Sequence, residues 1–210
     1  MERKPKIYIL DDEPQILEAI THLVKPIEAE VETYCRVDDF LAGFQNDGPA
    51  CLVLDVRLPG MSGMELQKHL TQEGYGIPVI IVTGHADVRM AVDAVKAGAA
   101  GFLEKPFRPQ ELFEEIQKTL RADVERWERL DEEQSIDRKL SLLKVGERKV
   151  VDLIRQGKNN YEIAEALDLS LRGVEARRAK VMRTLRVDSK TELLRLLRMP
   201  GPHNASQPSS

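Results

Sequence analysis

Five polar side chains in the first half of the chain stand where short apolar runs end. They are three acids, a hydroxyl and an amine: Asp11, Asp12, Asp55, Thr83 and Lys105. Carboxylates gathered in one place repel one another unless a cation joins them, and a set of oxygen ligands suits Mg²⁺. A carboxylate held by Mg²⁺ and backed by a lysine can attack a phosphoryl group, because the cations offset the charge that develops on its oxygens. These residue types therefore indicate phosphoryl transfer to a carboxylate.

The apolar runs must form neighbouring strands if these side chains are to meet. Strand-like runs occupy 6–10, 30–34, 51–54, 78–82 and 100–103, and apolar residues at helical spacing follow each of them. This alternation predicts an α/β fold with a five-stranded parallel, doubly wound (flavodoxin-like) sheet that is covered on both faces. Ligands bind beyond the carboxyl ends of the strands in such sheets. The sheet would therefore bring all five side chains to one edge.

Length and composition bound the class of protein. The chain of 210 residues is long for one domain and suits two, and its 42% hydrophobic and 31% charged residues allow each domain a core. No apolar run reaches the roughly 18–20 residues of a membrane span, and residues 1–6 do not resemble a signal peptide. Cys35 and Cys51 lack metal-ligand spacing, which excludes a disulfide scaffold and a structural zinc site. We expect a cytoplasmic protein without a membrane segment.

The first half resembles the receiver domain of two-component response regulators. The likeness covers about residues 4–121 and has no departure at a chemically important position. Four segments carry it: Ile9–Glu13, Leu54–Gly63, Val82–His85 and Phe102–Phe107. The resemblance implies that a sensor histidine kinase donates a phosphoryl group to this domain.

The resemblance also implies roles at a metal site, with Mg²⁺ as the cofactor. Asp55 would be the phosphoacceptor. Asp12 would bind Mg²⁺ directly and Asp11 would bind it through water. The backbone carbonyl of Arg57 would complete the protein ligands, together with Asp55.

Other residues would act on the transferred group. Lys105 is implied to pair with the phosphoryl group and Thr83 to hydrogen-bond to it, so both join the phosphoacceptor in the catalytic set. Phe102 would respond to Thr83 by changing its packing, which makes these two residues the switch. In this family the Lys105–Pro106 peptide is cis, a form that proline tolerates. His85 is interpreted as a loop residue.

A long helix is predicted after the last strand. Pro109–Lys139 contains no glycine and only its opening proline, and it is rich in Glu, Arg, Gln and Leu. Phe113, Leu120 and Trp127 lie seven residues apart, as in a coiled coil, but Asp123 interrupts the companion seam. A charged, solvated linker helix is the alternative.

The second half is basic, whereas the first is acidic. Residues 141–198 carry a net charge of +6 and the remaining residues carry −10. This asymmetry suggests a regulatory domain joined to a nucleic-acid binder, with chance surface bias as the other explanation. From Leu142 the periodicity predicts four helices, with Ser170 as N-cap of the third and a capping box at Ser189–Glu192 before the fourth.

The third of these helices, Leu171–Leu185, is predicted to read DNA. Its apolar residues Val174 and Val181 would be buried. The small residues of its other face would approach base edges in the major groove, while flanking cations neutralise phosphates. A solvated basic helix on a protein-binding domain is the alternative. The predicted DNA-binding residues are Arg172, Glu175, Ala176, Arg178, Ala179, Lys180 and Arg183.

The second half resembles the helix-turn-helix domain of the NarL/FixJ (LuxR-type) regulators over about residues 142–198. The matching segments are Glu147–Val151, Gly157–Ala164, Leu167–Ser170 and Val174–Met182. The usual Ser or Thr cap of the first helix is Lys144, which leaves Ser141 as a substitute cap, and Val145 and Gly146 also depart from the family. The usual Thr is Gly173 and the usual His is Arg177. Because of these departures, the resemblance does not predict which DNA sequence the domain binds.

These features predict four parts of the chain and one function. The parts are a receiver over 1–121, a helical linker over 122–140, a helix-turn-helix domain over 141–198 and a disordered tail over 199–210. Phosphoryl transfer to Asp55 would control dimerisation and DNA binding of a transcription regulator. Its partners would be a sensor histidine kinase, double-stranded DNA, a second copy of the chain and RNA polymerase.

Two other functions remain open at this stage. One is a phospho-dependent protein-binding adaptor, which the departures at Lys144 and Gly173 keep open. The other is a regulator that does not depend on phosphorylation, against which the intact receiver residues argue. An enzymatic output is not expected, since residues 140–210 contain no nucleophile–base set, and the receiver would catalyse only its own phosphotransfer and dephosphorylation.

Overall fold

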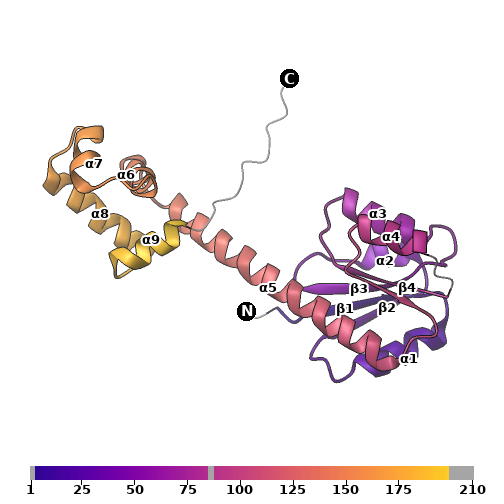
Figure 1. Cartoon of the computed structure of the whole chain (residues 1–210). Coiled ribbons are helices and arrows are strands. Elements are labelled where there is room, and N and C mark those ends of the chain that lie inside the picture. The colour runs from indigo at the N-terminus through magenta and orange to yellow at the C-terminus, as the bar shows by residue number, and fades with distance from the viewer. Residues whose placement is uncertain (1–2, 85–87, 199–210) are drawn as a thin grey trace. The chain divides into compact units, whose positions relative to one another are not determined.

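The computed structural model describes residues 3–84 and 88–198 (Figure 1). The chain divides into two compact units, Met1–Glu128 and Arg129–Ser210. His85 and the tail 199–210, for which the sequence predicted a loop and a disordered segment, lie outside the described residues. None of the described helices is both long and apolar enough to cross a membrane.

The described residues of the first unit form a five-stranded parallel sheet in the order β2-β1-β3-β4-β5. This is the flavodoxin-like order, so the predicted fold class is confirmed. The strands are β1 (Lys6–Leu10), β2 (Glu30–Tyr34), β3 (Ala50–Asp55), β4 (Val79–Thr83) and β5 (Gly101–Glu104). The helices are α1 (Pro14–Val24), α2 (Val37–Gly43), α3 (Gly63–Gln72), α4 (Val88–Lys96) and α5 (Pro109–Ser141), which continues into the second unit.

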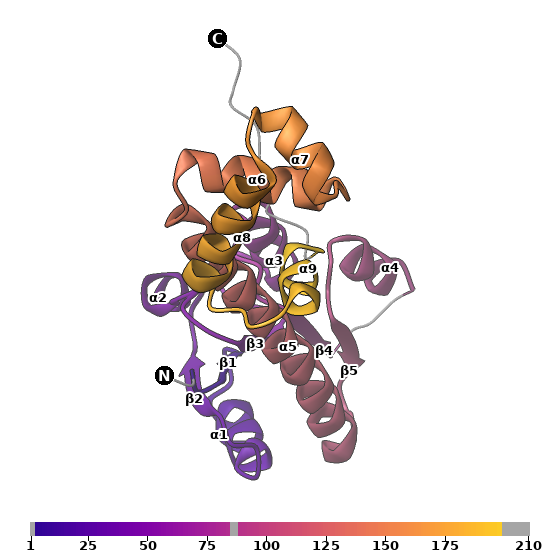
Figure 2. The same ribbon diagram turned by 90° about the vertical axis from the view of Figure 1, so that its left-hand side faces the viewer.

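Helices cover both faces of this sheet (Figure 2). One apolar layer packs the sheet against α2, α3 and α4, with Phe40 and Leu66 at its centre. The other packs the sheet against α1 and α5, with Ile20 and Leu112 in contact with it. β3 contributes to both layers and is buried along its whole length, as its continuous apolar run predicts.

The register of the strands aligns their carboxyl ends. Leu10 pairs with Leu54, so Asp11 and Asp55 follow at the same level of the sheet. Asp55 itself pairs with Val82, one residue before Thr83. A slip of one residue would turn each of these side chains to the other face. The register therefore decides whether the polar groups can meet.

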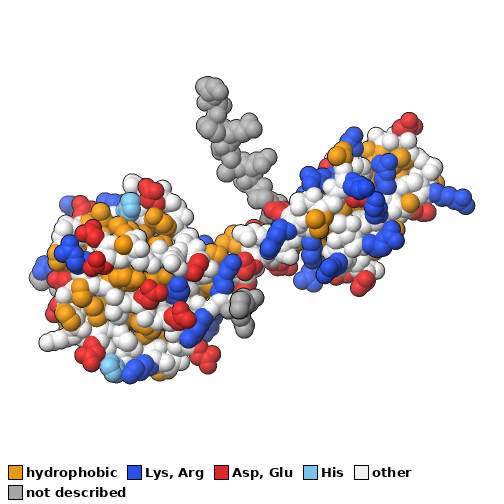
Figure 3. Space-filling model, turned by 180° about the vertical axis from the view of Figure 1, so that it is seen from behind, with side chains coloured by type: hydrophobic (Ala, Val, Ile, Leu, Met, Phe, Trp, Pro, Cys, Tyr) orange, Lys and Arg blue, Asp and Glu red, His pale blue; other side chains and the backbone are white. Residues whose placement is uncertain are grey.

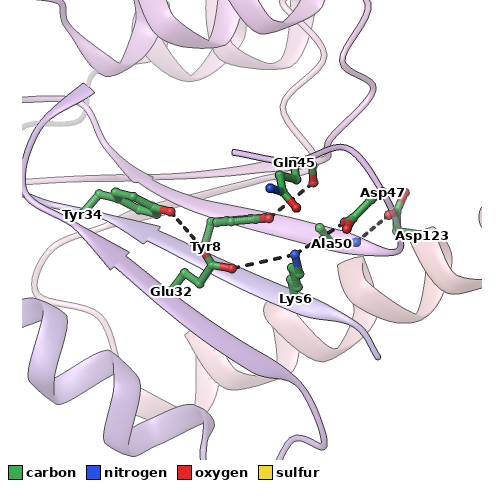
Figure 4. Close-up of polar contacts among 8 residues, drawn as sticks. All are labelled: Lys6, Tyr8, Glu32, Tyr34, Gln45, Asp47, Ala50 and Asp123. Atoms are coloured by element: carbon green, nitrogen blue, oxygen red, sulfur yellow. Dashed lines mark hydrogen bonds and ion pairs between the residues drawn. The ribbon is translucent and has the colours of Figure 1, made fainter. Parts of the chain in front are cut away.

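At the opposite edge of the sheet, a buried aspartate ties α5 to the first residue of β3 (Figure 4). Asp123 is almost fully buried, and its carboxylate accepts hydrogen bonds from Ala50 N at 2.8 Å and from Arg126 Nε at 2.6 Å. Ile116 and Leu120 are buried against the same unit's sheet. These contacts use the α5 face that the coiled-coil interpretation required, and they explain why Asp123 interrupts its pattern.

Up to residue 198, where the described residues end, the second unit contains the end of α5 and four short helices around one apolar core. The helices are α6 (Val145–Arg155), α7 (Asn160–Leu167), α8 (Leu171–Leu185) and α9 (Lys190–Arg198). Val174, Val181 and Leu185 of α8 are buried in the core, as the periodicity predicts. Leu197 of α9 is also buried there.

The caps of these helices explain how the departures from the family are tolerated. Ser170 Oγ accepts a hydrogen bond from Gly173 N at 3.1 Å, which confirms the predicted N-cap of α8. Ser141 does not cap α6, because its hydroxyl donates to the carbonyl of Arg138. Instead the Glu147 carboxylate accepts from Lys144 N at 2.8 Å, so α6 keeps half of a capping box without a Ser or Thr.

Candidate functional site

Asp55 lies at the end of β3 with a buried carboxylate. Asp55 is 5% exposed, and its Oδ1 lies 2.8 Å from the Nζ of Lys105. Its Oδ2 accepts a hydrogen bond from the backbone N–H of Arg57, two residues further on. Both oxygens are therefore held at the carboxyl edge of the sheet.

Asp11 occupies the equivalent place after β1. Its residue is 3% exposed; Oδ1 accepts from Glu13 N at 2.9 Å and Oδ2 lies 2.7 Å from the Nζ of Lys105. The ammonium of Lys105 therefore bridges two buried carboxylates that belong to different strands. The neighbouring Asp12 is exposed.

The charge of Lys105 is stabilised by this arrangement. Burial lowers the pKa of the ammonium, but its hydrogen bonds to Asp11 and Asp55 outweigh burial and hold the pKa above its ordinary value. A positive charge thus stands between the two carboxylates and offsets their repulsion. The Lys105–Pro106 peptide is cis, as the resemblance implies.

Thr83 and Phe102 lie on the two strands that follow Asp55 along the chain. Thr83 is the last residue of β4 and is 1% exposed, and its carbonyl accepts a hydrogen bond from Lys105 N at 2.7 Å. Phe102 pairs in register with Ile81 on the next strand and packs, half-buried, against the layer that contains α4. Asp55, Thr83 and Lys105 therefore lie at the carboxyl edge of the sheet, whereas Phe102 lies further back on β5, level with Ile81.

The oxygen donors at this edge fit the chemistry of Mg²⁺. Asp11, Asp12, Asp55 and the carbonyl of Arg57 offer only oxygen, which is what this hard cation prefers. Within the described residues, however, no three acidic, His or Cys side chains are grouped closely enough to form a metal site. Lys105 bonds to Asp11 and Asp55, and the side chain of Asp12 is exposed.

Gly63, which sequence reasoning passed over, is required for this geometry. It begins α3, and its N–H donates to the carbonyl of Val56 at 3.0 Å. A Cβ at position 63 would collide with the backbone carbonyl oxygen of Asp55. The only sequence signal for this role is the glycine at the end of the Leu54–Gly63 segment.

In the second unit, α8 presents the predicted basic face. Lys and Arg side chains are visible over this unit in Figure 3. Of the predicted DNA-binding residues, Arg178 and Lys180 bond within their own domain: Arg178 Nη1 donates to Asn160 Oδ1 at 2.6 Å, and Lys180 Nζ lies 3.1 Å from Glu147 Oε1. The exposed remainder is Arg172, Glu175, Ala176, Ala179 and Arg183.

Two departures from the family face each other in this unit. The guanidinium of Arg177 lies over Gly146 at the start of α6, and a Cβ at position 146 would stand 2.9 Å from Arg177 Nη1. The absence of a side chain at Gly146 thus gives Arg177 its space. Neither Gly146, Glu147 nor Asn160 was singled out as a partner of α8 in the sequence, because each lies on another helix.

Known proteins resemble both halves of the chain. A model of the response regulator receiver domain matches residues 7–117, and one of the bacterial regulatory proteins of the luxR family matches residues 145–197. The response regulator protein TodT of Pseudomonas putida is 36% identical over 195 residues, which are 93% of this chain and 86% of TodT. The transcriptional regulatory protein FixJ of Azorhizobium caulinodans is 35% identical over 93% of this chain and 92% of its own length.

Solved structures agree with these sequence matches. The low-resolution structure of the response regulator StyR has a TM-score of 0.83 at 36% identity, over 93% of this chain and 98% of that one. Full-length FixJ from B. japonicum has a TM-score of 0.54 at 33% identity, over 93% and 96%. The chain therefore belongs to the two-component response regulators of the NarL/FixJ family, transcription regulators that join a receiver to a LuxR-type DNA-binding domain.

Proposed function

We propose that this regulator is switched on by phosphoryl transfer from a sensor histidine kinase to Asp55, which promotes dimerisation and binding to double-stranded DNA. The observation that carries the proposal is the buried pair of carboxylates bridged by Lys105 at distances of 2.7 and 2.8 Å. We assign the receiver to residues 1–121, the linker to 122–140 and the DNA-binding domain to 141–198.

In the reaction, an Asp55 carboxylate oxygen would attack phosphorus while the bond from phosphorus to the donor nitrogen breaks and its electron pair stays with the imidazole. Lys105, which already binds that carboxylate, would then pair with the phosphoryl oxygens as negative charge develops on them. Asp12, Asp11, Asp55 and the Arg57 carbonyl would hold Mg²⁺, which neutralises phosphoryl charge when bound. The exposed position of Asp12 leaves it free to turn toward the metal.

The signal would leave the site through Thr83 and Phe102. The phosphoryl group brings new oxygen acceptors next to the buried Thr83 side chain. A hydrogen bond from the Thr83 hydroxyl would open space beside β5, and the half-buried Phe102 would change its packing to fill it. This change would alter the surface through which two receivers associate.

The output would be DNA binding by α8, with RNA polymerase as a further partner at the promoter. The exposed alanines Ala176 and Ala179, with Glu175, would face the bases, while Arg172 and Arg183 would contact phosphates. The two monomers of a dimer would read two half-sites, as helix-turn-helix dimers do. A phospho-dependent adaptor would share the receiver chemistry but would not bind DNA.

The choice of phosphoacceptor is tested by Asp55→Asn. This variant should lose labelling by radioactive acetyl phosphate in Mg²⁺, since the amide is not a nucleophile for phosphorus, and EDTA should abolish labelling of the unaltered chain. Asp38→Asn removes an exposed carboxylate of the same domain and should label normally. Undiminished labelling of Asp55→Asn would show that another carboxylate accepts the phosphoryl group.

The switch is tested by Thr83→Ala. The variant should still be phosphorylated, but it should lose most of the phosphorylation-induced gain in dimerisation, a coupling of about 1–3 kcal/mol in such systems. Sedimentation velocity of the phosphorylated chains measures the gain, and Thr83→Ser, which keeps the hydroxyl, should retain it. A Thr83→Ala chain that dimerises as well as the unaltered protein would contradict the coupling.

The DNA-binding face is tested by Ala179→Glu, which adds bulk and negative charge where α8 would meet the bases. We expect loss of specific DNA binding in a gel-shift assay with normal labelling of Asp55, because position 179 is exposed and away from the core. Gln156→Glu adds the same charge at an exposed position after α6 and should bind DNA nearly normally. If Ala179→Glu retains full DNA binding, the adaptor becomes the better explanation.

A further inference from the structure

The four cations of α8 that were predicted to bind DNA fall into two groups in the structure. Arg178 and Lys180 are bonded to residues of other helices in the same domain. Arg172 and Arg183 are exposed, and their side chains have no hydrogen-bond or ion-pair partner within residues 3–84 and 88–198. The two groups therefore differ in what they can offer to a phosphate.

The partner of Lys180 is a buried carboxylate. Glu147 has a side chain that is 7% exposed, and its Oε1 lies 3.1 Å from the Lys180 ammonium. Its other oxygen, Oε2, accepts a hydrogen bond from Lys144 N at 2.8 Å. Each carboxylate oxygen thus has one partner, and removal of Lys180 would leave Oε1 of a buried anion without its cation.

Arg178 makes the corresponding bond to α7. Its Nη1 donates to Asn160 Oδ1 at 2.6 Å, and Asn160 is the first residue of α7. Together the two bonds join the middle of α8 to the amino-terminal turns of α6 and α7. The two residues lie two positions apart on α8 and so point to different sides of the helix. Together the two bonds restrain the position of α8 and its rotation about its own axis.

We propose that Arg178 and Lys180 are positioning residues, which hold α8 at the angle needed for the major groove, and that Arg172 and Arg183 make the phosphate contacts. The proposal rests on the proposed function, because it takes α8 as the helix that reads DNA. It differs from the sequence prediction, in which most of the four cations, Lys180 among them, contact phosphates.

The two roles differ in their salt dependence. A cation that binds a phosphate releases condensed counterions, so its loss reduces the slope of log affinity against log salt by about 1. A lysine that stays bonded to Glu147 when DNA binds releases no counterions. Its loss lowers affinity through the position of α8 and leaves the slope unchanged.

The experiment uses the full chain treated with acetyl phosphate and Mg²⁺, and a duplex that the unaltered protein selects from a random-sequence pool. Affinity is measured over a series of salt concentrations for Lys180→Met, Glu147→Gln and the double variant. Arg172→Met is the matched variant for a phosphate contact. Glu162→Gln is the control for capping-box loss, since Glu162 makes the same bond to Asn159 N at 2.8 Å and pairs with Lys158 rather than with α8.

Lys180→Met and Glu147→Gln should each weaken binding about tenfold, the scale of one hydrogen bond to a charged group. Both should keep the salt slope of the unaltered chain, and the double variant should be no weaker than the weaker single one. Lys180→Arg, which can still reach Glu147, should restore affinity. Arg172→Met should reduce the slope by about 1, and Glu162→Gln should bind nearly normally.

The opposite result has a distinct signature. If Lys180 contacts a phosphate, Lys180→Met reduces the slope by about 1, and Glu147→Gln binds DNA as tightly as the unaltered chain or more tightly, because it frees the lysine. Circular dichroism on heating checks that each variant is folded; should Glu147→Gln unfold, the slopes of Lys180→Met and Lys180→Arg still decide. If Ala179→Glu and all of these variants bind DNA normally, the proposed function itself is wrong.

Discussion

The ammonium of Lys105 joins two buried carboxylates, and the receiver site depends on that contact. Asp11 and Asp55 end different strands, and their negative charges would be costly to bury side by side without a cation between them. The contact requires β1, β3 and β5 to end at the same level, which the strand register provides. It also leaves a reactive oxygen of Asp55 next to a positive charge before any phosphoryl donor arrives.

β3 connects the Lys105 site at one edge of the sheet to α5 at the other edge. Its last residue is the proposed phosphoacceptor, and its first residue donates its N–H to Asp123 of α5. The helix that leads toward the DNA-binding domain is therefore bonded to the strand that carries the reaction. Replacement of Asp123 would leave the buried backbone N–H of Ala50 without its hydrogen-bond partner, which would destabilise the fold.

The sequence predicted most of the receiver because its chemistry stands at strand ends. The apolar runs located the strands to within one residue, and the polar residue after each run then had only one edge on which to lie. The sequence could not predict contacts between distant positions. Asp123 and Ala50 are 73 residues apart, and neither residue type is unusual on its own.

The same limit applies to the DNA-binding unit. The periodicity of α8 predicted which residues are buried, yet it could not tell which cations of the other face bond to neighbouring helices. Glu147 and Asn160, on α6 and α7, bond to two of those cations. Gly146 and Arg177 depart from the family together, and the structure supplies the reason, since the guanidinium occupies the space that a side chain at 146 would take.

The central claim is that the charge state of Asp55 governs DNA binding, and one titration tests it most directly. The affinity of the full chain for a selected duplex is measured while the phosphorylated fraction, read by intact mass spectrometry, is raised with acetyl phosphate in Mg²⁺. Our account predicts that affinity rises with the phosphorylated fraction and falls back as the phosphoryl group is lost. An affinity that is the same in the unphosphorylated and the fully phosphorylated chain would contradict it and would favour a regulator that does not depend on phosphorylation.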